Sequence, residues 1–244
     1  MIPASPGPLS AADRDGTGLV CVGEMYGLQV DQLAALLNLT AREASAAVSR
    51  WTRRGLAESA ALGPGPPWLW LTKAGLQVCG LPYQATQPAL SRLAHLRAVT
   101  AVWLALQEAP EYAAGGAHWR SERRLRSHVG GRLGSREHLP DAEVHWPDAS
   151  GLAWAGECWA IEAELAPKTV SRTTAIMREL LARTGDYGCP PDQARVPGLA
   201  ARHARAVYLC TPAAGRTVAR ARAALGSLAA RVEIRPLPAS AAWP

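Results

Sequence analysis

The first apolar pattern along the chain predicts a helix-turn-helix. Over Val30–Leu37 the leucines recur at helical spacing on one face, and this pattern stops before Thr40. Thr40 and Glu43 have the spacing of a capping box, which opens a second helix over Ala41–Arg54. That helix is expected to end at Gly55, because glycine is preferred just beyond a helix C-terminus. Two helices joined by about three turn residues are typical of a helix-turn-helix.

The next residues predict a β-hairpin, which completes a winged helix. The segments Leu56–Glu58 and Trp68–Leu71 read as strands and flank a Gly/Pro-rich tip at Gly63–Pro67. A short helix after the hairpin closes the unit, and Ala11–Tyr26 is a further helical segment ahead of it. We therefore expect a winged-helix DNA-binding domain over residues 10–82.

The pattern changes beyond a linker at Leu81–Pro88. Leu90–Glu108 has apolar residues at three- and four-residue steps, which predicts a helix. Strands are then expected over His118–Leu125, Ala142–Trp146, Glu157–Leu165, Ala206–Cys210 and Val232–Arg235, and helices over Thr169–Arg183 and Ala213–Leu228. This order predicts an α/β (α+β) domain with a mixed sheet over residues 89–238.

Three carboxylates in the second domain form one predicted site. Glu162 and Glu164 lie two residues apart on a predicted strand, so they project from the same face. If Ala142–Trp146 and Glu157–Leu165 pair antiparallel, with the register centred on the intervening loop, Asp141 lies opposite Glu162. Buried like charges are costly without a counter-ion, and oxygen ligands suit a hard cation such as Mg²⁺. We expect Asp141, Glu162 and Glu164 to bind Mg²⁺.

The same acids also have a plainer interpretation, as solvated residues on an edge strand that pair with Arg172 or Arg178. Lys168 favours the metal site, because it follows Glu164 by four residues and is one of only two lysines among 26 cationic residues. The plain interpretation of Lys168 is an exposed lysine near a helix start. Both interpretations stay open at this point.

The strings Pro140-Asp141 and Ile161-Glu162-Ala163-Glu164 resemble the metal motif of the PD-(D/E)XK nuclease superfamily. In that superfamily an aspartate begins the second core strand, and an acidic-x-lysine triplet ends the third. The resemblance implies a restriction-endonuclease-like domain in which Asp141 and Glu162 hold Mg²⁺ and Glu164 is a ligand or a base. Glu164 stands where lysine usually stands, so Lys168 is the candidate for the missing cation. It would orient water or stabilise the developing phosphorane charge.

The order of features is similar to that of the replication-relaxation family of actinobacterial mobile elements. The likeness covers roughly residues 11–209 and rests on a predicted winged helix followed by Leu71-Thr72-Lys73-Ala74-Gly75, a His95-bearing helix, Ser121-Glu122-Arg123, Pro140-Asp141 and Glu162-Ala163-Glu164-Leu165. It implies a DNA-binding protein of a plasmid or integrative element that acts in replication or conjugative transfer, with Mg²⁺-dependent nicking as its chemistry. We also expect a homodimer and contacts with replication or transfer proteins.

Two other functions stay open. Glu164 in the place of lysine is compatible with a winged-helix transcription or replication regulator whose nuclease-like domain is catalytically inactive. A protein-interaction adaptor is the third option, because winged helices also serve as protein-contact modules. The adaptor predicts no salt-sensitive affinity for DNA, whereas the regulator predicts sequence-specific protection without cleavage.

Two groups of polar residues are the candidate contacts to double-stranded DNA. On the second helix of the helix-turn-helix, the residues placed to reach base edges are Arg42, Ser45, Ser49, Arg50 and Arg53. In the second domain, the arginines whose forked guanidiniums suit phosphate oxygens are Arg120, Arg123, Arg124, Arg126, Arg132 and Arg136. The plainer interpretation of the second group is a solvated basic face.

Charge and cysteine usage narrow the class further. The net charge of +6 permits an anionic partner, and most of the excess lies in residues 151–244, which carry 12 cationic and 7 acidic residues. The five cysteines form no C-x-x-C pair, so a disulfide framework or zinc ribbon is not predicted. No signal-peptide pattern and no apolar stretch of about 18 residues is present, so we expect a cytoplasmic protein without a membrane partner. The histidines and tyrosines have no recognisable ligand or nucleophile spacing.

Overall fold

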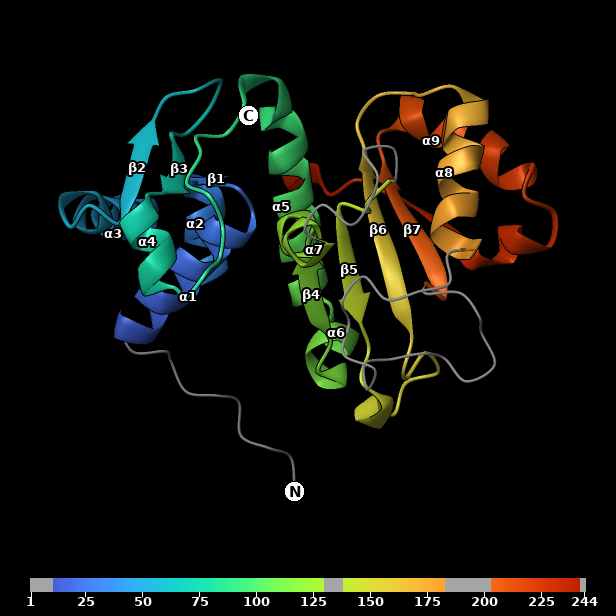
Figure 1. Cartoon of the computed structure of the whole chain (residues 1–244), viewed down its shortest axis with the longest axis horizontal. Coiled ribbons are helices and arrows are strands. Elements are labelled where there is room, and N and C mark those ends of the chain that lie inside the picture. Colours follow the sequence, from blue (N-terminus) through green and yellow to red (C-terminus); the bar gives the residue numbers. More distant parts are fainter. Residues whose placement is uncertain (1–10, 130–137, 183–202, 242–244) are drawn as a thin grey trace. The chain divides into compact units, whose positions relative to one another are not determined.

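The computed structural model describes residues 11–129, 138–182 and 203–241 and divides into two compact units (Figure 1). The first unit runs to Leu96 and the second begins at Arg97, so the division falls within helix α5 (Leu93–Glu108). The protein is a mixed α/β protein that contains a mixed sheet. No helix in the described ranges has both the length and the apolar character that crossing a membrane requires.

The first unit combines several helices with a small antiparallel sheet. Its elements are α1 (Ala11–Glu24), β1 (Leu28–Gln29), α2 (Val30–Leu37), α3 (Ala41–Arg53), β2 (Ala57–Ala60), β3 (Trp68–Leu71) and α4 (Lys73–Val78), followed by the short helix η1 (Leu90–Arg92). The strands pair antiparallel in the order β1-β3-β2. Strand β1 has no counterpart in the prediction, because two residues carry no alternation that a pattern can reveal.

The predicted start and end of α3 are confirmed. The Thr40 hydroxyl accepts the Glu43 backbone N–H at 3.3 Å, and the Glu43 carboxylate accepts the Thr40 backbone N–H at 2.8 Å. Gly55 follows the helix with a φ of 69°, the left-handed conformation that glycine adopts without a steric penalty. The apolar side of α3 is buried through Ala44, Ala47, Val48 and Trp51.

The second unit is built on a five-stranded mixed sheet in the order β4-β5-β6-β7-β8. After α5, its elements are α6 (Pro110–Gly115), β4 (His118–Ser121), α7 (Glu122–Val129), β5 (Ala142–His145), η2 (Asp148–Ser150), β6 (Cys158–Glu164), α8 (Val170–Ala182), β7 (Arg205–Cys210), α9 (Pro212–Ala223), η3 (Gly226–Arg231), β8 (Val232–Pro236) and η4 (Ala239–Ala241). Strands β4, β5 and β6 pair antiparallel, whereas β6, β7 and β8 pair parallel. Helix α9 makes the crossover between β7 and β8, as a parallel pair requires.

Alternate residues of β6 serve different cores on the two faces of this sheet. Ile161 and Ala163 pack with residues of α5 in one core. Ala160 packs with residues of α8 and α9 in the other core, and Figure 1 shows these two helices on the same face of the sheet. Because side chains alternate along a strand, Glu162 and Glu164 project toward the α8 and α9 side.

Two predicted elements are wrong in part. The strand predicted over His118–Leu125 ends at Ser121, because the Ser121 hydroxyl accepts the Arg124 backbone N–H at 3.1 Å and caps α7. The single helix predicted over Ala213–Leu228 is interrupted after Ala223, and the separate turn of η3 begins at Gly226. Of the arginines predicted to contact phosphate, Arg132 and Arg136 lie outside the described residues.

Candidate functional site

The three predicted carboxylates lie at the same end of the β5 and β6 pair. The strands pair with Ala142 opposite Ile161, so Asp141 directly before β5 lies opposite Glu162. The Asp141 Oδ2 atom accepts the Ala163 backbone N–H at 2.8 Å, which fixes this side chain against β6. The predicted antiparallel register is therefore confirmed.

Both glutamates are buried in the middle of the sheet. Strand β6 is the central one of five, and Glu162 and Glu164 are only 2% and 5% exposed. The alternative of solvated acids on an edge strand is wrong. Arg178, which that alternative made a partner, donates instead to the carbonyl of Ala224.

Two basic side chains contact the buried glutamates. Lys168 Nζ lies 2.5 Å from Glu164 Oε1, so the lysine that stood out in the sequence does contact the acidic group. His138 Nε2 lies 2.6 Å from Glu162 Oε1, and the His138 backbone N–H donates to Glu179 on α8 at 2.9 Å. His138 was not among the predicted site residues, although it precedes Asp141 by only three positions.

Burial and neighbouring charges shift the pKa values of this pair. The pKa of Glu162 is raised to about 7, first by burial and then by the charge of Asp141, against the opposing effect of His138 and Lys168. Burial lowers the pKa of His138, but the hydrogen bond and the charge of Glu162 outweigh it and raise that pKa overall. The pair therefore holds a proton more tightly than either group does in water.

Tyr208 lies beside the acidic group formed by Asp141, Glu162 and Glu164. It lies opposite Glu162 in the parallel register of β6 and β7, is fully buried, and has no hydrogen-bond partner for its hydroxyl within the described residues. Burial and then the charges of Glu162 and Glu164 raise the pKa of Tyr208 well above its usual value. The side chain is therefore a neutral phenol, which can donate a hydrogen bond but is a poor nucleophile.

The donor chemistry of the acidic group fits Mg²⁺. Asp141, Glu162 and Glu164 offer carboxylate oxygens, which are the ligands that Mg²⁺ prefers. His138 and Lys168 already satisfy part of that need, so a bound cation would have to displace them from the two glutamates. The presence of Mg²⁺ at these residues remains a prediction.

A second polar group, which the sequence did not suggest, lies toward the other end of the same strand pair. Glu143, Cys158 and His203 are buried, and their ligand atoms all lie within 4.8 Å of one another, a grouping that can hold a metal ion. His145 lies opposite Cys158 in the register. The register predicted from the loop already gives this pairing, whereas nothing in the local sequence indicates that His203 reaches it.

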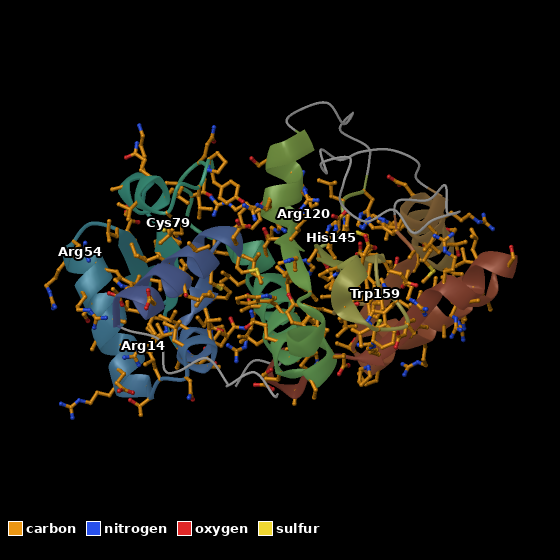
Figure 2. The ribbon with its side chains drawn as sticks, turned by 90° about the horizontal axis from the view of Figure 1, so that it is seen from below. Arg14, Arg54, Cys79, Arg120, His145 and Trp159 are labelled. Carbon is orange, nitrogen blue, oxygen red and sulfur yellow. The ribbon has the colours of Figure 1, made fainter. Side chains whose placement is uncertain are left out.

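The four described arginines of the second basic group divide between core and surface. Arg120 and Arg123 are 8% and 7% exposed, and Arg120 Nη1 lies 3.5 Å from the buried Glu143 carboxylate. Figure 2 shows Arg120 close to His145, on neighbouring strands of the same sheet. Buried guanidiniums cannot reach phosphate without rearrangement, so the expected contact is supported only for the exposed Arg124 and Arg126.

The polar face of α3 is exposed as the sequence predicts. This face carries Arg42, Ser45, Ser49, Arg50 and Arg53. Arg50 Nη2 lies 2.8 Å from Asp15 Oδ1, an exposed ion pair that a phosphate can replace at small cost. The Ser45 hydroxyl donates to the Ala41 carbonyl at 2.8 Å. Contact of this face with DNA remains a prediction.

Comparison with known proteins adds no family. No model of a known protein family matches the chain, and no curated protein matches it. The likenesses to PD-(D/E)XK nucleases and to the replication-relaxation family therefore rest on the residues of this chain and stay predictions.

Proposed function

We propose that the chain is a DNA-binding protein of a plasmid or integrative element, acting in replication or conjugative transfer through Mg²⁺-dependent nicking of DNA. In this proposal the first unit is a winged helix and the second is a nuclease-like domain. The observation that carries the proposal is the meeting of Asp141, Glu162 and Glu164 at one end of the two central antiparallel strands.

The order of elements supports the nuclease-like domain. Asp141 directly precedes β5, the second strand of the sheet, and Glu162 and Glu164 end β6, the third. This is the arrangement that the PD-(D/E)XK resemblance implies. The helix pair and the three-stranded sheet of the first unit support a winged helix in the same way.

At such a site the residues of the chain would have separate roles. Asp141, Glu162 and Glu164 would hold Mg²⁺, which when bound supplies Lewis-acid activation of water and of the phosphate. Lys168, freed from Glu164, would stabilise negative charge on the phosphate. Tyr208 would donate its hydroxyl, which has no partner in the described part of the chain, to an oxygen atom at the site, because a neutral phenol is a hydrogen-bond donor.

The test is nicking of supercoiled plasmid by the purified chain in Mg²⁺ and in chelator. We expect open-circular product with the wild type in Mg²⁺ only, and its loss in Asp141→Asn. The matched control is Glu233→Gln, since Glu233 is a half-exposed acid on β8 of the same sheet that pairs with Arg235. Equal nicking by the wild type and Asp141→Asn, or none by either, would refute the cleavage part of the proposal.

A regulator with an inactive nuclease-like domain is the second candidate. The observation that favours it is the contact of Glu162 with His138 and of Glu164 with Lys168, which gives the buried acids polar partners without a metal ion. This candidate predicts a sequence-specific footprint on DNA that needs no Mg²⁺ and is accompanied by no nicks. The footprint would weaken in Arg42→Ala and Arg53→Ala, which remove exposed cations from α3.

A further inference from the structure

The second polar group brings three different kinds of ligand atom into one buried place. Glu143 extends from β5, Cys158 from the first position of β6, and His203 from two residues before β7. Their exposed fractions are 0%, 2% and 0%. His145 adds a fourth donor, with Nε2 at 2.9 Å from Glu143 Oε2 and 3.6 Å from Cys158 Sγ.

The hydrogen bonds of His203 place two acceptor atoms face to face. Its Nδ1 lies 3.0 Å from the Leu180 carbonyl oxygen, which only accepts, so Nδ1 must carry the proton. In a neutral ring the lone pair of Nε2 then faces the Glu143 carboxylate, whose Oε1 is 2.9 Å away. Two acceptors at this distance require a proton or a metal ion between them. A proton would sit on the ring or on the carboxyl group of Glu143.

The thiol of Cys158 favours the metal ion. A proton shared by imidazole and carboxylate needs no sulfur atom, whereas sulfur, imidazole and carboxylate are all ligand types that zinc takes in proteins. With Zn–S near 2.3 Å and Zn–N near 2.0 Å, ligand atoms of a tetrahedral site lie about 3.5 Å apart. The 3.6 Å between Cys158 Sγ and His145 Nε2 matches that spacing.

We propose that Glu143, Cys158 and His203 bind a structural metal ion of the zinc class, with His145 as the fourth ligand. The Leu180 carbonyl orients His203 by accepting from Nδ1, and Arg120 lies 3.5 Å from the second oxygen of Glu143. Such outer contacts commonly orient metal ligands. Because the ligands are buried, the ion meets no substrate and instead ties β5, β6 and the start of β7 together.

The test measures metal bound by the full chain. After stripping with chelator, loading with Zn²⁺ and desalting, we expect one ion per chain by elemental mass spectrometry. Cys158→Ser and His203→Gln should lose it. Cys210→Ser should keep it, because Cys210 is also buried in this sheet but lies outside the group. Glu162→Gln should keep it too, which separates this site from the acidic one.

Loading with Co²⁺ gives a readout independent of stoichiometry. Wild type and Cys210→Ser should develop tetrahedral d–d bands and a thiolate-to-cobalt charge-transfer band, and Cys158→Ser should lack the latter. Circular dichroism of the metal-free chains checks that each variant folds. If Cys158→Ser does not fold, His203→Gln takes its place in the test. A folded wild type that takes up neither Zn²⁺ nor Co²⁺, or a Cys158→Ser variant with unchanged uptake and spectrum, would overturn the proposal in favour of a proton shared by His203 and Glu143.

Discussion

Replacing Glu162 by glutamine should change how the stability of the protein depends on pH. The pKa of Glu162 is raised from its ordinary value of 4.5 to about 7 in the folded chain, mainly by burial. Because the folded pKa lies above the unfolded one, the contribution of Glu162 to stability is fully present below the unfolded pKa. It is lost as pH rises through the folded pKa. The free energy of unfolding should therefore fall between about pH 4.5 and 7.

The size of the effect follows from the same values. A difference of one in pKa corresponds to about 1.4 kcal/mol, so ionising Glu162 costs the folded state about 3 kcal/mol. Glu162→Gln keeps an oxygen for His138 but cannot ionise, and it removes the charge that raises the pKa of His138. The measurement is made in chelator, which removes bound metal. Under these conditions the variant should lack the fall in the free energy of unfolding that ionisation of Glu162 causes.

The assay is urea unfolding at several pH values between 5 and 8, followed by a spectroscopic signal that reports on the second unit. Glu43→Gln is the control, because hydrogen bonds from Thr40 lower the pKa of Glu43. The contribution of Glu43 is lost only at lower pH, so this variant should keep the wild-type dependence between pH 5 and 8. If the free energies of unfolding of wild type and Glu162→Gln change in parallel across this range, ionisation of Glu162 does not destabilise the fold, and the reasoning is wrong.

The remaining predictions concern the first unit. Gly75→Ala should destabilise it by about 1–3 kcal/mol in urea unfolding, because a Cβ there would lie 2.0 Å from the Leu56 carbonyl oxygen. Gly16→Ala is the control, since it meets no atom within 4 Å in α1 and should stabilise by about 0.5–1 kcal/mol. An equal response to the two substitutions would contradict this. Thr40→Ala should cost about 1 kcal/mol by the same measurement and Thr40→Ser much less, because only alanine removes the acceptor for the Glu43 N–H.

Features set by short-range patterns could be predicted from the sequence. The α3 capping box needs only Thr40 and Glu43, and the position of Asp141 opposite Glu162 needs only a strand period of two and a loop-centred register. Lys168 follows Glu164 by only four residues, so their contact is local in the sequence, although a loop rather than a helix joins the two residues.

Features that depend on pairings between distant parts of the chain could not be predicted from the sequence. Tyr208 comes next to Glu162 only through the parallel pairing of β6 and β7, which are separated by a crossover helix. The charge run around residue 120 predicts a surface, but the register of β4 and β5 places Arg120 opposite Glu143 and buries it. His203 reaches Glu143 across 60 residues, a separation over which no periodicity carries information.

The central claim, that Asp141, Glu162 and Glu164 form a Mg²⁺ centre, is tested most directly by the melting temperature of the purified chain as Mg²⁺ is added. A ligand that binds only the folded state raises that temperature with concentration. The account predicts a rise that grows with the logarithm of the Mg²⁺ concentration for wild type and Glu233→Gln, and no rise for Asp141→Asn. The same rise in Asp141→Asn, or none in the wild type, would contradict it.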